Sequence, residues 1–229
     1  MGSTVKIEHG LNFQYEDKAS AAGYGVIAGI DEAGRGPLAG PVVAAAVIVR
    51  ARGFLERIDD SKKLSAKKRE LAYLEIMSKC DVGIGVSGPG EIDEVNIFNA
   101  TLLAMKRAVG ELKTAPDFLL IDGKMDVPLP TKRAYLIRGE SKSTSIACAS
   151  IIAKVTRDRM MLDEDAKYPE YGFKQHKAYG TRAHLEAIKK FGFSPIHRRS
   201  FGPFGGKEGG YTVAGKPKAG IQDTEGIRQ

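Results

Sequence analysis

The amino-acid sequence predicts a mixed α/β fold, and three observations support this expectation. The chain has 229 residues, of which 42% are hydrophobic, enough to bury a sizeable core. Short apolar runs, often β-branched and bounded by Gly, Pro or a charged residue, have the pattern of strands in a well-covered sheet. Capping residues and helical spacings between and after these runs predict helices.

The expected strands are YGVIAGID, PVVAAAVIV, DVGIGVSG, DFLLID and RAYLIR, at residues 24–31, 41–49, 81–88, 117–122 and 133–138. The first three follow one another as in an antiparallel meander, whereas helical stretches separate the later ones. Glycines in the third run spell GxGxxG, but they lie inside a strand rather than opening a helix after one. We interpret them as small strand residues, not as a dinucleotide-binding loop.

The expected helices lie between and after the strands. A helix capped by Ser65 follows the second run and carries Leu71, Leu74 and Met77. A helix after the third run presents Leu102, Met105 and Val109. A further helix runs from about Ser143 through IACASIIAKVTRDRMM, and Thr181 can cap RAHLEAIKKF before Gly192.

Composition divides the chain into a polar leader at residues 1–20, a folded domain at 21–204 and a tail at 205–229, which we predict to be disordered because Gly and Lys dominate it. Neither a signal peptide nor an apolar run of membrane-spanning length is present, so we expect a soluble, cytoplasmic monomer with no membrane partner. The chain has only two cysteines, Cys80 and Cys148, which we expect to serve apolar packing. A net charge of +7 favours polyanionic partners such as nucleic acid.

Acidic residues mark the ends of two expected strands. Asp31 and Glu32 follow the first apolar run, and Asp122 ends FLLID. A single terminal Asp is commonly a turn or helix cap, but two strands that end alike point to a site. Crowded carboxylates repel unless a cation bridges them, and oxygen ligands suit Mg²⁺ or Mn²⁺.

The run VIAGIDEAG also resembles a Walker B strand, which would indicate an NTPase. The required partner motif is missing, however. The stretch nearest to a P-loop, FGPFGGKEGG, has Phe201 in place of the first Gly and Glu208 in place of the Ser or Thr that holds Mg²⁺. We therefore exclude an NTPase.

Several motifs in order resemble bacterial ribonuclease HII, and the resemblance extends from Tyr24 to Phe204. They are GIDEAGRGPLAGPV, DSKKL, IDGK, SIIAKVTRDR, HKAYGT and PIHRRSF. The resemblance implies a ribonuclease H-like fold, with a five-stranded mixed sheet flanked by helices and a small helical C-terminal portion. It also implies cleavage of RNA in RNA/DNA hybrids and 5′ of single ribonucleotides embedded in duplex DNA, with 3′-hydroxyl and 5′-phosphate products, as in removal of misincorporated ribonucleotides.

By the same resemblance, Asp31, Glu32 and Asp122 match the catalytic acids that bind two metal ions, Mg²⁺ or Mn²⁺. Gly34, Arg35 and Gly36 match the element that recognises the ribose 2′-hydroxyl; without the resemblance they would be a glycine turn with a solvated arginine.

Tyr179 matches a tyrosine that stacks on the deoxyribose after the ribonucleotide, although an isolated Tyr is more often a core residue. Ser61, Lys62 and Lys63 match a phosphate-contacting segment; adjacent lysines alone would indicate a solvated surface. His197 and Arg198 also lie in a family motif, and we expect His197 to make structural hydrogen bonds.

The fourth acid departs from the family pattern. The family usually places Asp in a GD dipeptide after the last strand, whereas Glu140 stands there in this chain. Asp158 in TRDR is an alternative, although an ion pair on the helix surface is a simpler role for it.

Two other classes of function stay open on the sequence. A catalytically silent module that binds RNA/DNA would keep the basic charge but would not need the acids. A phosphohydrolase of small substrates would keep the acids but would not need the GRG element or Tyr179.

Overall fold

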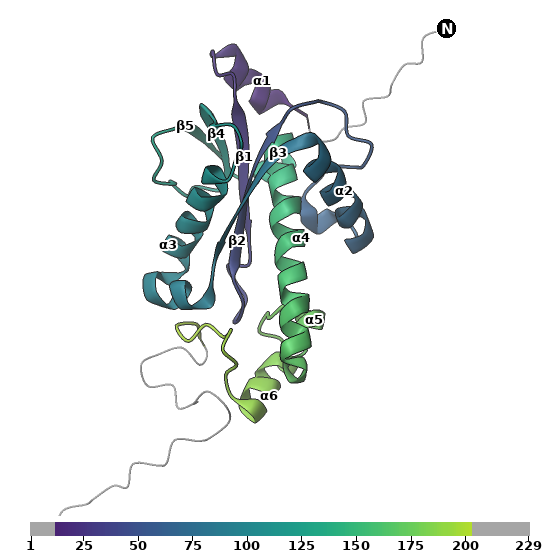
Figure 1. Ribbon diagram of the computed structural model, residues 1–229, viewed down its shortest axis with the longest axis vertical. Helices are drawn as coiled ribbons and strands as arrows, with labels where there is room; N and C mark the ends of the chain where they lie inside the picture. The colour runs from purple at the N-terminus through teal and green to yellow at the C-terminus, as the bar shows by residue number, and fades with distance from the viewer. Residues whose placement is uncertain (1–11, 203–229) are drawn as a thin grey trace, which may run out of the picture.

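The computed structural model describes residues 12–202, which form a five-stranded mixed sheet flanked by helices (Figure 1). The strands lie in the order β3-β2-β1-β4-β5. Their bounds are β1 (Ile27–Ala33), β2 (Val42–Val49), β3 (Cys80–Ser87), β4 (Phe118–Asp122) and β5 (Lys132–Leu136). All the predicted strands are present, and the mixed α/β fold is confirmed. The predicted tail and residues 1–11 of the leader lie outside the described residues.

The helices follow the predicted caps. Their bounds are α1 (Gln14–Ala21), α2 (Ala66–Lys79), α3 (Pro89–Gly110), α4 (Thr144–Lys167), α5 (Phe173–His176) and α6 (Arg182–Phe191). Side-chain oxygens of Ser65, Ser143 and Thr181 accept the first-turn N–H groups of α2, α4 and α6. Single 3₁₀ turns cover Ser61–Lys63, Gly139–Ser141 and Pro169–Tyr171.

Strand pairing brings the acidic ends of two strands to one edge of the sheet. β2 pairs antiparallel with both β1 and β3, so the predicted meander is confirmed. β1 pairs parallel with β4, with Ile30 opposite Ile121. Since parallel strands end at the same edge, the carboxyl ends of β1 and β4 bring Asp31 and Asp122 together.

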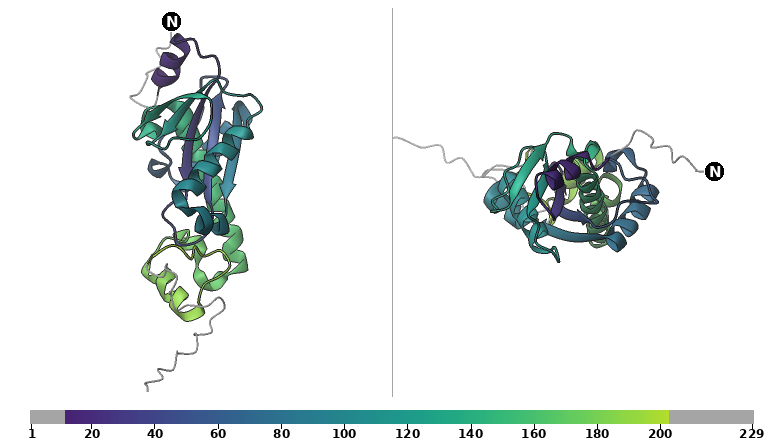
Figure 2. Two further views of the ribbon diagram at one scale, coloured as in Figure 1. Left: turned by 90° about the vertical axis from the view of Figure 1, so that its left-hand side faces the viewer. Right: turned by 90° about the horizontal axis from the view of Figure 1, so that it is seen from above.

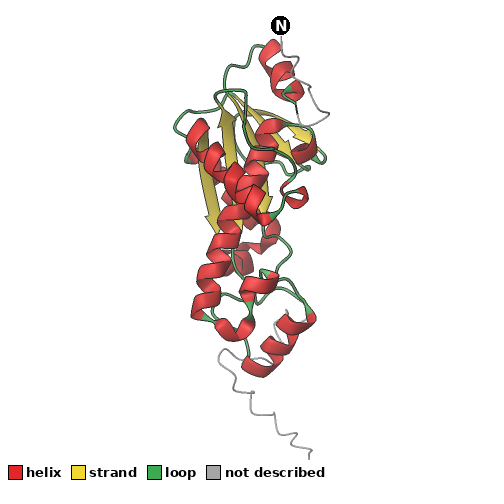
Figure 3. Cartoon of the chain, turned by 90° about the vertical axis from the view of Figure 1, so that its right-hand side faces the viewer, coloured by secondary structure: helices red, strands yellow, loops and turns green. Residues whose placement is uncertain are grey.

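Helices cover the two faces of the sheet, α3 on one face and α4 with α2 on the other (Figures 1 and 3). Small strand residues let these helices approach closely. A Cβ added at Gly83 or Gly85 would lie 2.0 or 1.9 Å from the carbonyl oxygens of Ala108 and Ala104 on α3. These glycines of the third strand therefore serve packing, as predicted.

The predicted apolar face of α2 was wrong. Ala72, Tyr73 and Ile76 are the buried residues of this helix, whereas three other apolar side chains are 42 to 56% exposed: Leu71, Leu74 and Met77. In α3 the expectation holds better, because Met105 is buried and Leu102 and Val109 pack against the core.

Helix α1 lies within the segment predicted to be a polar leader, and it packs onto the domain. Glu16 of α1 is 7% exposed, and its Oε1 accepts hydrogen bonds from Ser143 Oγ at 2.6 Å and from the backbone N–H of Ser145 at 2.8 Å. A carboxylate at the N-terminus of α4 is stabilised by the unpaired N–H groups there. This interaction fixes a short polar helix that lacks an apolar face.

The C-terminal portion forms a separate cluster beyond the end of the sheet, built from the last turns of α4 with α5 and α6 (Figure 2). Phe173 and Ile188 are fully buried in it. The predicted small helical C-terminal portion is thus present. None of the helices between residues 12 and 202 has the length and apolarity that crossing a bilayer requires.

Candidate active site

A cavity of about 360 Å³ opens at the carboxyl ends of β1 and β4. The sequence-predicted site residues that line it are Asp31, Glu32, Gly34, Arg35, Gly36, Ser61, Lys62, Asp122 and Tyr179. Chain segments separated by up to 148 residues, from Asp31 to Tyr179, therefore meet in one place. Lys63 and Glu140 are not among the residues that line the cavity. Lys63 Nζ instead donates to Asp59 Oδ1 at 3.2 Å, and Glu140 lies beside Asp122.

Asp31 is the most buried acid of this cavity. Its side chain accepts the backbone N–H of Glu32 at 2.8 Å, and it is hydrogen-bonded to Ser150 of α4. Burial, together with the charges of Glu32 and Asp122, raises its pKa well above the ordinary value. The fold thus holds this carboxyl where its ionised form lacks a counter-charge.

Glu32 and Glu140 also have raised pKa values, for the same reasons as Asp31. Burial raises the pKa of each, and the charge of Asp122 adds to the effect. Arg35 partly offsets it for Glu32 through a contact of 3.3 Å, and Lys62 Nζ lies 3.9 Å from Glu140 Oε1. In the described part of the chain, Oε2 of Glu32 and Oε2 of Glu140 are buried without a hydrogen-bond partner.

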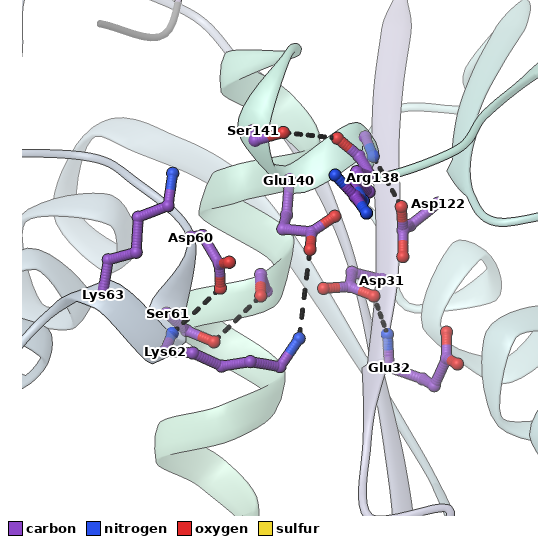
Figure 4. Close-up of polar contacts among 12 residues, drawn as sticks. Asp31, Glu32, Asp60, Ser61, Lys62, Lys63, Asp122, Arg138, Glu140 and Ser141 are labelled. Atoms are coloured by element: carbon purple, nitrogen blue, oxygen red, sulfur yellow. Dashed lines mark hydrogen bonds and ion pairs between the residues drawn. The ribbon is translucent and has the colours of Figure 1, made fainter.

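Glu140 comes to this cluster on the 3₁₀ turn after β5. The backbone N–H of Gly139 donates to Asp122 Oδ1 at 2.6 Å, and this bond places the turn beside the end of β4. Figure 4 shows the carboxylates of Asp31, Asp122 and Glu140 around one space, with Lys62 reaching Glu140. Asp158 instead pairs with Lys154 at 2.7 Å, so the geometry favours Glu140 as the fourth acid.

The acids fit a hard divalent cation in donor type and charge. All their ligand atoms would be carboxylate oxygens, two of which have no partner, and a cation would relieve the repulsion that raises their pKa values. Between residues 12 and 202, no three His, Cys, Asp or Glu side chains form a ready metal cluster. The carboxylates are therefore neighbours around a cavity, and their rotamers must converge for joint coordination.

Two buried arginines hold the loop that follows β1. Arg198 donates to the carbonyl oxygens of Gly34, Arg35 and Gly40 at 2.5, 3.0 and 2.9 Å. Arg157 donates to those of Ala39 and Pro41 at 3.2 and 3.0 Å. Each side chain is 1% exposed, so these bonds form away from water, where they are strong.

The GRG element is shaped by this anchoring. Gly34 has φ +96°, a conformation that favours glycine, and a Cβ there would lie 2.1 Å from Arg157 Nε. Arg35 keeps 44% of its side chain exposed at the mouth of the cavity. The tight turn thus leaves Arg35 free to reach a ligand while its backbone is fixed.

Tyr179 stands across the cavity from the acids on the loop between α5 and α6, and 49% of it is exposed. A Cβ on Gly36 would lie 3.6 Å from its ring. The backbone N–H of Leu38 donates to the carbonyl of Ala178 at 2.8 Å, which joins this loop to the one carrying the GRG element. An exposed aromatic ring beside a cavity is not a core residue.

Sequence reasoning missed three residues on α4 that line the cavity: Ser150, Lys154 and Arg157. Their spacing is i, i+4 and i+7, which places them on one face of the helix. Ser150 Oγ lies 3.0 Å from Ser61 Oγ and thereby links α4 to the DSKKL segment. A polar stripe on an otherwise apolar helix was the signal that could have found them.

Comparison with known proteins agrees with this geometry. The family model for Ribonuclease HII matches residues 28–203. Ribonuclease HII of Bacillus pumilus is 55% identical over 192 residues, 83% of this chain and 75% of that protein. Ribonuclease HII of Syntrophobacter fumaroxidans is 52% identical over 214 residues, 93% of this chain and 90% of that protein. Ribonuclease H2 of Pyrococcus horikoshii, a crystal structure, has a TM-score of 0.67 at 27% identity, covering 78% of this chain and 94% of that one.

Proposed function

The chain belongs to the ribonuclease HII family, and from this premise we propose that it cleaves 5′ of single ribonucleotides embedded in duplex DNA as well as within RNA/DNA hybrids. It is a metal-dependent nuclease that hydrolyses the RNA strand of such hybrids, built on the ribonuclease H-like fold. The finer proposal includes products with 3′-hydroxyl and 5′-phosphate ends and a role in removing misincorporated ribonucleotides.

The observation that carries this proposal is the shared cavity. It joins buried acids to an element suited to contact a ribose, and to an exposed tyrosine next to that element. A hydrolase of small phosphates would need only the acids. A catalytically silent binding module would not need carboxylates held so close together that their charges repel one another.

We propose that Asp31, Glu32, Asp122 and Glu140 hold Mg²⁺ or Mn²⁺. The bound ions would supply charge stabilisation at the phosphate and lower the pKa of the attacking water. The unpartnered oxygens of Glu32 and Glu140 support this assignment. The bond from the Gly139 N–H to Asp122 holds the turn that carries Glu140 beside the end of β4, which also supports it.

The remaining residues of the cavity are assigned to the substrate. The exposed guanidinium of Arg35 and the backbone around Gly34 and Gly36 contact the 2′-hydroxyl and its phosphate. The ring of Tyr179 packs on the following deoxyribose, so that an RNA-to-DNA junction is read by shape. Lys62 contacts the strand backbone as a charge and gives affinity without sequence preference.

The test is a cleavage assay with three labelled duplexes in Mg²⁺: one embedded ribonucleotide, a continuous RNA/DNA hybrid, and DNA alone. We expect cleavage of the first two and none of the third. Ligation of the downstream fragment and extension of the upstream one would identify the 5′-phosphate and 3′-hydroxyl ends. Cleavage of the hybrid with an intact single-ribonucleotide duplex would refute the finer proposal and leave the family activity in place.

A further inference from the structure

Three histidines of the C-terminal portion pack together next to the loop that carries Tyr179. The rings of His176 and His184 are stacked with centroids 4.6 Å apart, and those of His184 and His197 are 5.2 Å apart. Phe173 and Tyr171 pack against them. The activity assigned above uses none of these imidazoles.

The hydrogen bonds at both ends of the His197–His184 pair fix which nitrogen carries each proton. At one end, the backbone N–H of Ser194 donates to His197 Nδ1 at 3.0 Å, so this nitrogen is an acceptor. At the other end, His184 Nδ1 lies 3.0 Å from the carbonyl oxygen of Tyr179, which can only accept, so this nitrogen carries a proton. A neutral imidazole has one N–H, and the proton of His197 is therefore on Nε2.

The contact between the two rings agrees with this assignment. His197 Nε2 lies 3.1 Å from His184 Nε2, and one of the two must donate. The tautomers fixed from the ends supply one donor, His197, and one acceptor, His184. The hydrogen bonds therefore run in one direction, from Ser194 through both rings to the carbonyl of Tyr179.

Burial keeps this pair neutral. It lowers the pKa of His197 to about 3 and that of His184 to about 4. Protonation of His184 would set two N–H groups against each other at the short Nε2 contact, and protonation of His197 would set its Nδ1–H against the backbone N–H of Ser194. The series of hydrogen bonds from Ser194 to Tyr179 is consequently intact at any pH well above these two pKa values.

The loop that carries Tyr179, where this series of hydrogen bonds ends, needs the support that the bonds give. Lys177 and Ala178 have φ of +50° and +67°, a left-handed conformation that is strained for residues other than glycine. The carbonyls of Lys177 and Ala178 accept from Arg157 and from the backbone of Leu38. That of Tyr179 accepts from the backbone N–H of Thr181 at 2.7 Å and from His184 at 3.0 Å. Of these donors, only His184 acts at Tyr179 itself through a side chain.

We propose that His184 and His197 are positioning residues, which set the Tyr179 ring at the RNA-to-DNA junction and so tune the preference for single embedded ribonucleotides. This inference rests on the role proposed above for Tyr179. The hydrogen bonds from Ser194 through His197 and His184 to Tyr179, which we call the relay, do not contact the acids. Loss of the relay therefore alters substrate preference more than the rate of hydrolysis.

The chain offers a matched pair of variants. In His184→Asn the amide nitrogen lies near the place of Nδ1 and can still donate to the Tyr179 carbonyl, whereas in His184→Gln the amide lies near the place of Nε2 and cannot. The readout is the ratio of kcat/KM on a single-ribonucleotide duplex to that on a continuous hybrid. We expect His184→Gln to lower the ratio about tenfold, or about 1.4 kcal/mol, and His184→Asn to keep most of it.

Tyr179→Ala serves as the reference for the proposed function. A selective loss in Tyr179→Ala, together with equal losses on both substrates in His184→Gln, would overturn the relay and leave the role of Tyr179 standing. An equal loss in Tyr179→Ala would overturn both. A selective loss in Tyr179→Ala and in His184→Gln, with recovery in His184→Asn, supports the hydrogen bond from residue 184 to the Tyr179 carbonyl as the contact that positions the ring.

A measurement on the wild-type chain avoids any dependence on variant folding. Two-bond ¹H–¹⁵N correlation spectra at pH 7 distinguish the imidazole tautomers. We expect the Nδ1–H form for His184 and the Nε2–H form for His197. The Nε2–H form, or a protonated ring, at His184 would contradict the proposed direction of the relay.

Discussion

Substitution of Gly34 by alanine tests how the turn after β1 is held. A side chain at φ +96° costs about 1–2 kcal/mol in backbone strain. The new Cβ would also lie 2.1 Å from Arg157 Nε and 2.7 Å from the carbonyl oxygen of Pro41. Arg157 cannot move aside cheaply, because it is 1% exposed and donates three hydrogen bonds.

The expected loss follows from these contacts. Breaking one charged hydrogen bond of Arg157 costs about 1.5–3 kcal/mol. Together with the strain, Gly34→Ala should lower the free energy of unfolding by about 2.5–5 kcal/mol, which a domain of ordinary stability survives. The assay is guanidinium unfolding followed by circular dichroism, with cleavage of the single-ribonucleotide duplex measured on the folded protein.

Gly23→Ala is the matched control. Gly23 has almost the same φ, +97°, but a Cβ there would meet nothing within 4 Å. It should cost only the strain of about 1–2 kcal/mol and leave cleavage unchanged. Equal destabilisation by the two substitutions would refute the reasoning, since it would show that the Arg157 contact contributes nothing to the turn.

Three further predictions concern the charged residues of the cavity. Burial and the charges of Glu32 and Asp122 raise the pKa of Asp31, so its ionised form destabilises the fold at any pH above the unfolded pKa of about 3.9. Asp31→Asn should therefore stabilise the metal-free protein at pH 7 by about 0.5–2 kcal/mol. Thermal unfolding should show that this gain vanishes below about pH 4. Glu140→Gln should lower turnover severely in Mg²⁺ and in Mn²⁺, and Glu140→Asp should lower it about tenfold. Asp158→Asn should leave turnover nearly unchanged, because Asp158 pairs with Lys154. The reverse ranking would make Asp158 the fourth acid. Arg35→Ala should weaken cleavage of ribonucleotide-containing DNA and leave the unfolding midpoint unchanged, because the Arg35 side chain is exposed. Unchanged steady-state kinetics would show that Arg35 is a solvated surface residue with no role in cleavage.

Local patterns were sufficient to predict the sheet and the acids. The β-branched runs lie where β1 to β5 form, and acids at the ends of two runs meet because β1 and β4 are parallel. The sequence itself shows which strand ends carry a carboxylate, whereas the meeting of the two ends depends on the parallel pairing of β1 with β4.

Features that depend on tertiary contacts could not be predicted in the same way. Helix α1 lacks an apolar stripe, and its place in the fold comes from Glu16 meeting the N-terminus of α4. On α2, the sheet and α4 bury Ala72, Tyr73 and Ile76, whereas Leu71 and Leu74 lie on the exposed side of the helix.

The roles of Arg157 and Arg198 could not be predicted for a related reason. A charged side chain in a basic sequence normally indicates a solvated surface, whereas these two are among the largest fully buried side chains of residues 12–202. Their partners are backbone carbonyls of a loop distant in sequence, and carbonyls leave no signature in the amino-acid sequence.

We propose that the acids at the ends of β1 and β4 perform the hydrolysis at an embedded ribonucleotide. The most direct measurement is single-turnover cleavage of a duplex with one ribonucleotide in Mg²⁺ by the wild type and by Asp122→Asn, with binding of the same duplex followed by fluorescence anisotropy. We predict that Asp122→Asn loses nearly all cleavage and still binds, because the neighbouring Arg35 and Lys62 are unchanged. Turnover like that of the wild type in folded Asp122→Asn would contradict the account.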